Sequence, residues 1–228
     1  MVFINQLLDF FLPRFCPACN NALSASEYFV CENCIANIKL ADADLIKSEF
    51  ERKFSGEKII TNFHSLFVFE KDKEFQSIVH SIKYKENFRL AVFLGKFVGQ
   101  KLNEIIKSWS PDLLIPIPLH HLKKAERGYN QSFYLAKGIS SACKIPVKKN
   151  IIRRKRFTPS QTQLNLKQRK ENMEGAFSIN KNVSLQDKNI ILIDDVITTG
   201  STISECGKIL KETGAKNVYA ITSAIADI

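Results

Sequence analysis

The sequence predicts an α/β protein in which helices cover both faces of a parallel sheet, with a small cysteine-containing module at the N-terminus. Three observations support this fold class: two close cysteine pairs near the N-terminus, continuously apolar strand-like runs that alternate with amphipathic helical patterns, and a hydroxyl-rich turn directly after one of these runs. The 228 residues, 45% of them hydrophobic, suit one ordinary α/β domain with a small appendage.

The cysteine pairs are Cys16–Cys19 and Cys31–Cys34, with residues 20–30 between them. Each pair can present two thiolates on one side of a turn, and four thiolates complete the tetrahedral set that Zn²⁺ accepts. A redox dithiol is the alternative, but such a pair does not come doubled at this spacing. We therefore predict a closed, structural zinc site, a zinc-binding module and linker over residues 1–60, and the α/β domain over residues 61–228.

The apolar N-terminal segment 2–13 bears on where the protein resides. It is too short to span a bilayer and has no basic leader of the kind that begins a signal peptide. We expect it to pack on the domain, and we expect a cytoplasmic protein without a transmembrane segment, in which a reducing environment keeps the thiols free.

The first half of the domain follows from periodicity. Residues 40–60 are charged and weakly patterned, which is typical of a linker, and the alternating segment 61–70 predicts a strand. Apolar residues at helical spacing predict one helix over 75–82 and a longer one over 90–106. Gly95 and Gly99 lie inside the longer pattern, where they lower helix propensity, so we expect close packing there.

The second half contains four further strand predictions. The apolar run 113–115, followed by two prolines, predicts a buried strand, after which we expect a helix over about 131–143 and a strand near 147–152. The run 190–193, a helical pattern ended by Gly214, and the run 218–222 together predict one βαβ unit.

Positive charge is concentrated between residues 144 and 170. The chain carries a formal net charge of +10, and this segment contains lysines and arginines but no acid. Such a segment attracts polyphosphate or nucleic acid, although a solvated loop has the same composition. The sequence shows few clustered aromatic residues of the kind on which single-stranded bases stack.

The strand at 190–193 leads into the most informative motif. Asp194 and Asp195 follow it at the carboxyl end, where open α/β sheets bind ligands, and a turn then leads into a helix. Gly200 lets the backbone turn inward so that amides and hydroxyls converge on one point, which is a cradle for a phosphate monoester. The predicted phosphate-binding residues are Val196, Thr198, Thr199, Gly200, Ser201 and Thr202.

Two adjacent carboxylates beside a phosphate cradle suit the hydroxyls of a ribose 5-phosphate, because each can accept a charge-assisted hydrogen bond from the diol. The alternative is a helix N-cap at Thr199 or Ser201, with the acids favouring the helix dipole. That alternative explains the hydroxyls but not two acids at the end of an apolar strand, where unpaired charge is costly to bury.

The motif DDVITTGST resembles the phosphoribosyl pyrophosphate signature of type I phosphoribosyltransferases. The four cysteines, RGYNQS (127–132), the segment 155–177 and the lysine of SIKYK (81–85) make the chain similar to the ComF (ComFC/GntX-like) family, which is linked to DNA uptake in natural transformation. The resemblance runs over nearly the whole chain and is weakest over residues 40–60. It implies a type I phosphoribosyltransferase-like fold.

The resemblance also implies a pyrophosphate side of the site. A loop after the strand at 113–118 is expected to grip pyrophosphate, and a long basic loop over 153–175 is expected to close over it, with Mg²⁺ holding the leaving group. The residues assigned to this side are Leu119, His120, Arg127, Arg154, Arg156, Arg169 and Lys83. For His120 a solvated turn, and for Lys83 an ordinary surface position, are the alternatives.

Three functions remain open from the sequence. The resemblance implies a protein that binds phosphoribosyl pyrophosphate or ribose 5-phosphate, as a phosphoribosyltransferase whose acceptor the motif does not identify, since Thr198 stands where purine-type members place an acid. The second is a non-catalytic phosphoribosyl-sensing adaptor that binds single-stranded DNA and passes it to a competence helicase (ComFA) or a DprA-like mediator. The third is a zinc-stapled adaptor with a vestigial pocket.

Overall fold

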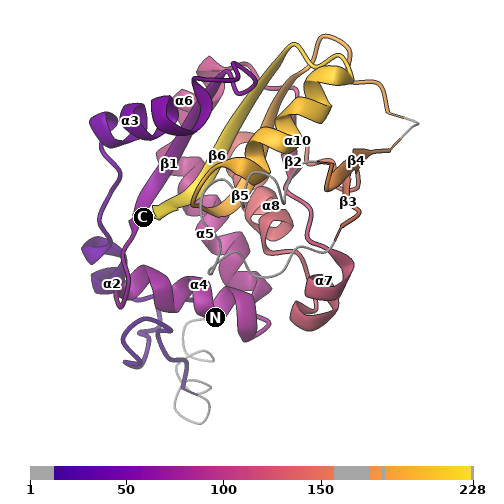
Figure 1. Cartoon of the computed structure of the whole chain (residues 1–228). Coiled ribbons are helices and arrows are strands. Elements are labelled where there is room, and N and C mark those ends of the chain that lie inside the picture. The colour runs from indigo at the N-terminus through magenta and orange to yellow at the C-terminus, as the bar shows by residue number, and fades with distance from the viewer. Residues whose placement is uncertain (1–12, 157–174, 181–182, 227–228) are drawn as a thin grey trace.

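A central sheet of four parallel strands organises the chain (Figure 1). The computed structural model describes residues 13–156, 175–180 and 183–226. The strands lie in the order β1 (Asn62–Phe69), β6 (Asn217–Ala226), β5 (Asn189–Ile197) and β2 (Leu113–Pro116). Because all four strands are parallel, their carboxyl ends meet at one edge of the sheet.

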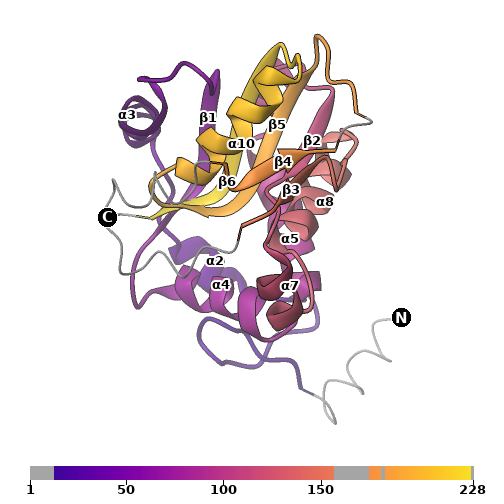
Figure 2. The same ribbon diagram turned by 45° about the vertical axis from the view of Figure 1, so that its right-hand side comes forward.

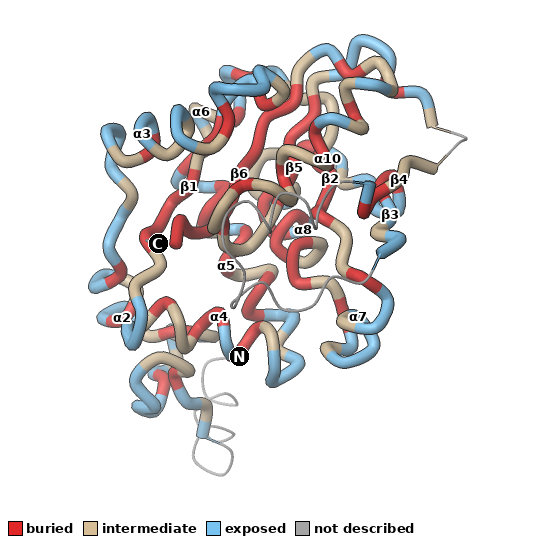
Figure 3. Tube along the Cα trace, in the orientation of Figure 1, coloured by how far each residue is buried: buried red, intermediate tan, exposed pale blue. Residues whose placement is uncertain are grey.

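Helices cover both faces of this sheet, as Figure 2 shows. One core contains Ile191 and Ile193 of β5, and the other contains their neighbours Ile190 and Leu192, so β5 is buried on both sides (Figure 3). The first face carries α4 (Glu74–Tyr84), α5 (Phe88–Lys101), α6 (Asn103–Ser108) and α8 (Gln131–Cys143). The second carries α3 (Ala43–Phe54), α10 (Ser201–Glu212) and an antiparallel hairpin of β3 (Ile152–Arg154) and β4 (Phe177–Ile179). The predicted fold class is confirmed.

Helices α5 and α8 approach each other closely at glycines. A Cβ atom at Gly95 would lie 2.0 Å from the carbonyl oxygen of Leu135, and one at Gly138 would lie 2.2 Å from that of Val92. At Gly99 the added atom would lie 3.0 Å from the Cα of Ile139. The close packing predicted at Gly95 and Gly99 is confirmed.

The structure also differs from the sequence predictions in several elements. The segment 40–60 contains α3, whose N-cap Asp42 accepts a hydrogen bond from the Leu45 amide at 2.8 Å. The long predicted helix divides at Leu102 into α5 and α6, and a short helix, α7 (His121–Arg127), follows β2. Near residue 147 there is only an isolated bridge from Val147 to Leu114, and β3 begins at Ile152.

The N-terminal part packs on the domain in two places. Buried residues of the cysteine module, such as Val30 and Ile38, join the core under α4 and α5, whereas Phe54 at the end of α3 joins the core on the other face. The division of the chain at residue 60 stays a prediction. No helix in the described part of the chain combines the length and apolarity needed to cross a bilayer. The segment 2–12 and the basic residues 157–174 lie outside the described residues.

Candidate functional site

Asp194 and Asp195 stand near the carboxyl end of β5 and have different partners. Asp194 Oδ1 accepts hydrogen bonds from Ser132 Oγ at 2.8 Å and from the Asp195 amide at 2.9 Å. Asp195 Oδ2 lies 2.8 Å from Nζ of Lys83, which comes from the last turn of α4. Two helices on the same face of the sheet, α4 and α8, therefore each hold one carboxylate.

The two acids have different pKa values because their surroundings differ. Burial, and then the neighbouring charge of Asp195, raise the pKa of Asp194 to about 7. Burial also pushes the pKa of Asp195 upward, but the Lys83 ammonium outweighs it and holds that pKa below its ordinary value. Near neutral pH, Asp195 is thus the anion of the pair and Asp194 is poised to gain or lose a proton.

This difference predicts a pH-dependent effect of Asp194→Asn. Because the pKa of Asp194 is raised on folding, its contribution to stability is full below its ordinary value of 3.8 and is lost as the pH rises through about 7. Asparagine stays neutral and keeps an oxygen for Ser132. We compare the melting temperature of the variant with that of the parent at two pH values. The difference in favour of the variant is expected to be roughly 5 °C larger at pH 8.5 than at pH 5.5. A difference that is constant with pH would contradict the assignment.

A cavity of about 220 Å³ opens beside the two aspartates. It lies at the carboxyl edge of the sheet, between the ends of β2 and β5 and the starts of α8 and α10. The lining residues that the sequence predicts are Lys83, Leu119, Arg127, Arg154, Asp194, Asp195, Val196 and Thr202. Those that it does not predict are Ile117, Pro118, Lys123, Gln131 and Ser132.

The RGYNQS motif connects the parts of this site. The Tyr129 hydroxyl donates to the carbonyl of Ile82, next to Lys83, and Asn130 Nδ2 donates to the carbonyl of Ile117 at 2.9 Å. Ser132 then reaches Asp194. The motif therefore ties the end of α4, the loop after β2 and the end of β5 to the start of α8. Sequence reasoning assigned only Arg127 of this motif to the site.

Four cations line the cavity: Lys83, Lys123, Arg127 and Arg154. Burial, followed by the charges of Arg127 and Arg154, lowers the pKa of Lys123. Burial also lowers the pKa of Arg154, which projects from β3. A cavity with this many cations attracts a multiply charged anion.

The predicted phosphate loop lies between β5 and α10. Gly200 has φ of +80°, in the left-handed region, and α10 begins at the next residue. The hydroxyls of Thr199 and Ser201 lie 2.9 Å apart. Val196 and Thr202 line the cavity, and Thr198 to Ser201 span the turn between them. Amides at this helix entrance have the orientation that favours an anion.

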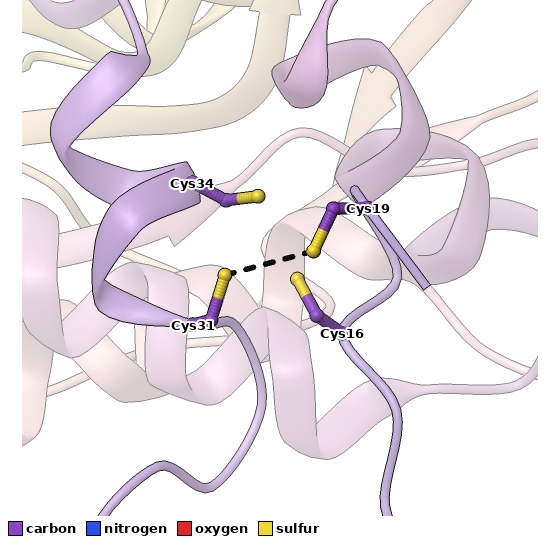
Figure 4. A group of neighbouring side chains, drawn as sticks. All are labelled: Cys16, Cys19, Cys31 and Cys34. Carbon is purple, nitrogen blue, oxygen red and sulfur yellow. Dashed lines mark hydrogen bonds between the residues drawn. The ribbon is translucent and has the colours of Figure 1, made fainter. Parts of the chain in front are cut away.

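The four module cysteines form a cluster beside α2 (Glu32–Asn37), with their sulfurs directed toward one another (Figure 4). All four Sγ atoms lie within 4.8 Å of one another, and those of Cys19 and Cys31 are 3.7 Å apart. A tetrahedral ion with bonds of about 2.3 Å separates its ligand sulfurs by roughly 3.8 Å. Burial and the neighbouring thiols raise the pKa of the Cys34 thiol, and a cation among the four sulfurs would favour its thiolate form. The arrangement fits a tetrahedral metal ion.

Comparison with known proteins agrees with this geometry. Residues 129–226 match the phosphoribosyl transferase domain. Competence protein F of Haemophilus influenzae is 39% identical over 110 residues, which cover 47% of this chain and 48% of that protein. Competence protein ComFC of Streptococcus pneumoniae is 33% identical over 141 residues, which cover 59% and 60%. The DNA utilization protein YhgH of Salmonella typhi is 29% identical over 144 residues, which cover 62% and 63%.

The chain is therefore similar to competence protein F and competence protein ComFC, and less than half of its length matches the phosphoribosyl transferase domain. The matched regions span between 48% and 63% of the length of these three relatives. The phosphoribosyl transferase match contains the start of α8, β5, the predicted phosphate loop and β6.

Two other predicted residues, His120 and Arg156, are not among the residues that line the cavity. His120 is only 3% exposed and caps α7, its Nδ1 accepting from the Leu122 amide at 3.4 Å. Arg156 is exposed beyond β3, and Arg169 lies outside the described residues. The predicted closure of the basic loop therefore stays a prediction.

Proposed function

We propose that this chain is a ComF protein and that it binds phosphoribosyl pyrophosphate or ribose 5-phosphate in the cavity at the carboxyl edge, in a cytoplasmic role linked to DNA uptake and processing. One observation carries this proposal: two carboxylates, the start of α10 and four cations surround a single cavity of about 220 Å³. Pockets for drug-sized ligands measure about 300–1,000 Å³. The smaller volume suits a sugar phosphate.

Each part of the proposed ligand has a chemical counterpart. The ribose hydroxyls would donate to Asp194 and Asp195, and the 5-phosphate would accept from the amides and hydroxyls of residues 198–202. A diphosphate on the anomeric carbon would meet Lys83, Arg127 and Arg154. Since Lys83 pairs with Asp195 at 2.8 Å, the ligand diol competes with this lysine, which is then available to the diphosphate.

The reaction class that this arrangement supports is transfer at the anomeric carbon. The bond from that carbon to the diphosphate breaks, the diphosphate leaves with the electron pair, and a nitrogen of an acceptor forms the new bond. The residues around the cavity would orient the sugar and stabilise the departing charge. Mg²⁺ would enter with the diphosphate and neutralise part of its charge, while Asp194 and Asp195 would hold the ribose.

Calorimetric titration with phosphoribosyl pyrophosphate and Mg²⁺ tests binding. Saturable binding to one site per chain is expected, and its absence overturns the proposal. Pyrophosphate release is then followed across nucleobases and single-stranded DNA. Release with one acceptor identifies a phosphoribosyltransferase, whereas binding without release supports a sensing adaptor. In either case the partners we propose are a competence helicase and a recombination mediator.

Binding of single-stranded DNA is a second candidate function, favoured by an aromatic strip next to the cavity. The strip consists of His80, Tyr84, Phe88, Tyr129, Phe133 and Tyr134. Tyr84 is 56% exposed and Phe88 42% exposed. Arg127, which also lines the cavity, lies 5.5 Å from the centre of the Tyr84 ring. Exposed rings interleaved with cations are suited to stacked bases and their phosphates.

Substitution in the aromatic strip tests this second function. The double variant Tyr84→Ala, Phe88→Ala is expected to bind a thymidine oligonucleotide about tenfold more weakly or worse, because it removes two stacking surfaces. Tyr28→Ala, which removes a tyrosine 61% exposed in the cysteine module, should leave this affinity unchanged. A loss confined to Tyr28→Ala would instead assign DNA binding to the module. Affinity for DNA should fall steeply with added salt.

A further inference from the structure

Helix α3 lies against the outside of the predicted phosphate loop. A Cβ atom at Gly200 would lie 3.1 Å from Cε1 of Phe54 and 3.2 Å from Cβ of Lys53. Lys53 Nζ donates a hydrogen bond to the carbonyl of Thr198, although 145 positions separate the two residues in the chain. The last turn of α3 thus contacts the loop through two consecutive residues, Lys53 and Phe54.

The position of α3 is fixed by the sheet. Before the helix, residues 39–41 bridge to β1 in antiparallel fashion, the Ala41 amide donating to Leu66 at 3.0 Å. At the end of the helix, the ring of Phe54 packs 5.7 Å from that of Phe63 in β1. Phe54 is 2% exposed. The helix is therefore anchored to β1 at both ends, which gives its last turn a defined place beside the loop.

The ammonium of Lys53 is itself held. Its side chain is 1% exposed, and Nζ lies 2.5 Å from Oε2 of Glu49 one turn earlier. Glu49 also accepts two hydrogen bonds from Arg52, at 3.0 and 2.8 Å. A buried, paired ammonium on a backbone carbonyl is a strong, charge-assisted contact.

This contact orients a peptide group of the loop. In a planar trans peptide, the carbonyl and the following N–H point in opposite directions. Because the carbonyl of Thr198 points outward to Lys53, the N–H of Thr199 points to the other side of the chain. A carbonyl that accepts from a cation also makes the N–H of the same peptide a better donor.

We propose that Lys53 is a positioning residue of the phosphate loop: it fixes the Thr198 carbonyl outward, so that the following amide faces the phosphate of the ligand. This inference rests on the proposed function of the loop. It adds a residue from the segment before β1, outside the matched phosphoribosyl transferase domain, to the determinants of phosphate affinity.

Lys53→Met tests the inference, because it keeps the apolar length of the side chain, removes the ammonium and leaves Glu49 paired with Arg52. The dissociation constant for ribose 5-phosphate is expected to rise about tenfold, as for the loss of one charge-assisted hydrogen bond. Hydrogen exchange of the amides in residues 198–202 is expected to accelerate, with the rest of the chain unchanged. Lys47→Met, at an exposed position of the same helix, should change neither quantity.

The two readouts separate this inference from the proposed function. If the parent protein binds no ribose 5-phosphate but Lys53→Met still accelerates exchange in the loop alone, the proposed function fails and the positioning role stands. If the parent binds and Lys53→Met leaves affinity or loop exchange unaltered, the positioning role is overturned. Faster exchange throughout the chain also overturns it. Should Lys53→Met not fold, Glu49→Gln weakens the ion pair that holds the Lys53 ammonium. This variant is expected to accelerate hydrogen exchange in the same loop, by a smaller factor.

Discussion

An Asp195→Ala variant is expected to bind phosphoribosyl pyrophosphate about 100-fold more weakly or worse, because each charge-assisted hydrogen bond to a sugar hydroxyl contributes about 1.5–3 kcal/mol. The raised pKa of Asp194 leaves Asp195 as the anion of the pair near neutral pH, so the neighbouring carboxyl does not replace it. Titration calorimetry at pH 7 measures the effect. Binding of single-stranded DNA should be largely retained.

The control for this variant removes an ion pair that lies away from the cavity. Asp112 lies 3.0 Å from Lys188 at the amino edge of the sheet, just before β2. Asp112→Ala should leave the affinity for phosphoribosyl pyrophosphate unchanged. An equal loss of sugar-phosphate and DNA binding in Asp195→Ala would show that the two ligands share one site, contrary to the proposal.

A Cys31→Ser variant is expected to lose bound zinc and to melt about 10 °C lower or more, because the free energy of metal binding in such a module is folding free energy. Cys31 is the N-cap of α2, and its Sγ lies 3.7 Å from that of Cys19, so serine disrupts the cluster at its centre. Differential scanning calorimetry and metal analysis measure the two effects. An unshifted melting curve refutes the structural role.

Two controls accompany this experiment. Cys143→Ser changes a half-buried cysteine outside the cluster, whose Sγ donates to the Gly99 carbonyl at 3.4 Å, and should retain the full zinc content. A strong chelator should lower the melting temperature of the parent toward that of Cys31→Ser and leave the variant unaffected.

The elements that sequence reasoning predicted well are those whose signal is local. The helix predicted over 131–143 has those bounds in α8, and the βαβ unit of β5, α10 and β6 follows from runs buried on both faces. The cysteine cluster follows from spacing alone, since two short turns bring four thiols together. Charge at the end of an apolar strand is unusual, which is why the sequence singles out Asp194 and Asp195; both line the cavity, and their role as ribose ligands stays a prediction.

The features that were missed depend on contacts between distant segments. Helix α3 has only Ile46 and Phe54 buried, so its pattern is that of a charged linker. Lys53 has the sequence context of a solvated lysine, and only the folded chain brings it to Thr198. Ser132 is part of the RGYNQS motif, but its hydrogen bond to Asp194 joins residues 62 positions apart, so no pattern in the neighbouring sequence indicates it.

The interlocked glycines of α5 and α8 limit how far one part of the cavity wall can move, because α8 supplies Gln131 and Ser132 to the lining. Backbones in such tight contact have little free volume in which to shift, so Ser132 and its partner Asp194 keep their positions whether or not a ligand is bound. Another part of the lining, Lys123 and Arg127, comes from α7, in which no residue is buried. Rearrangement on binding a ligand, and its entropic cost, should therefore fall mainly on the part of the cavity wall that α7 supplies.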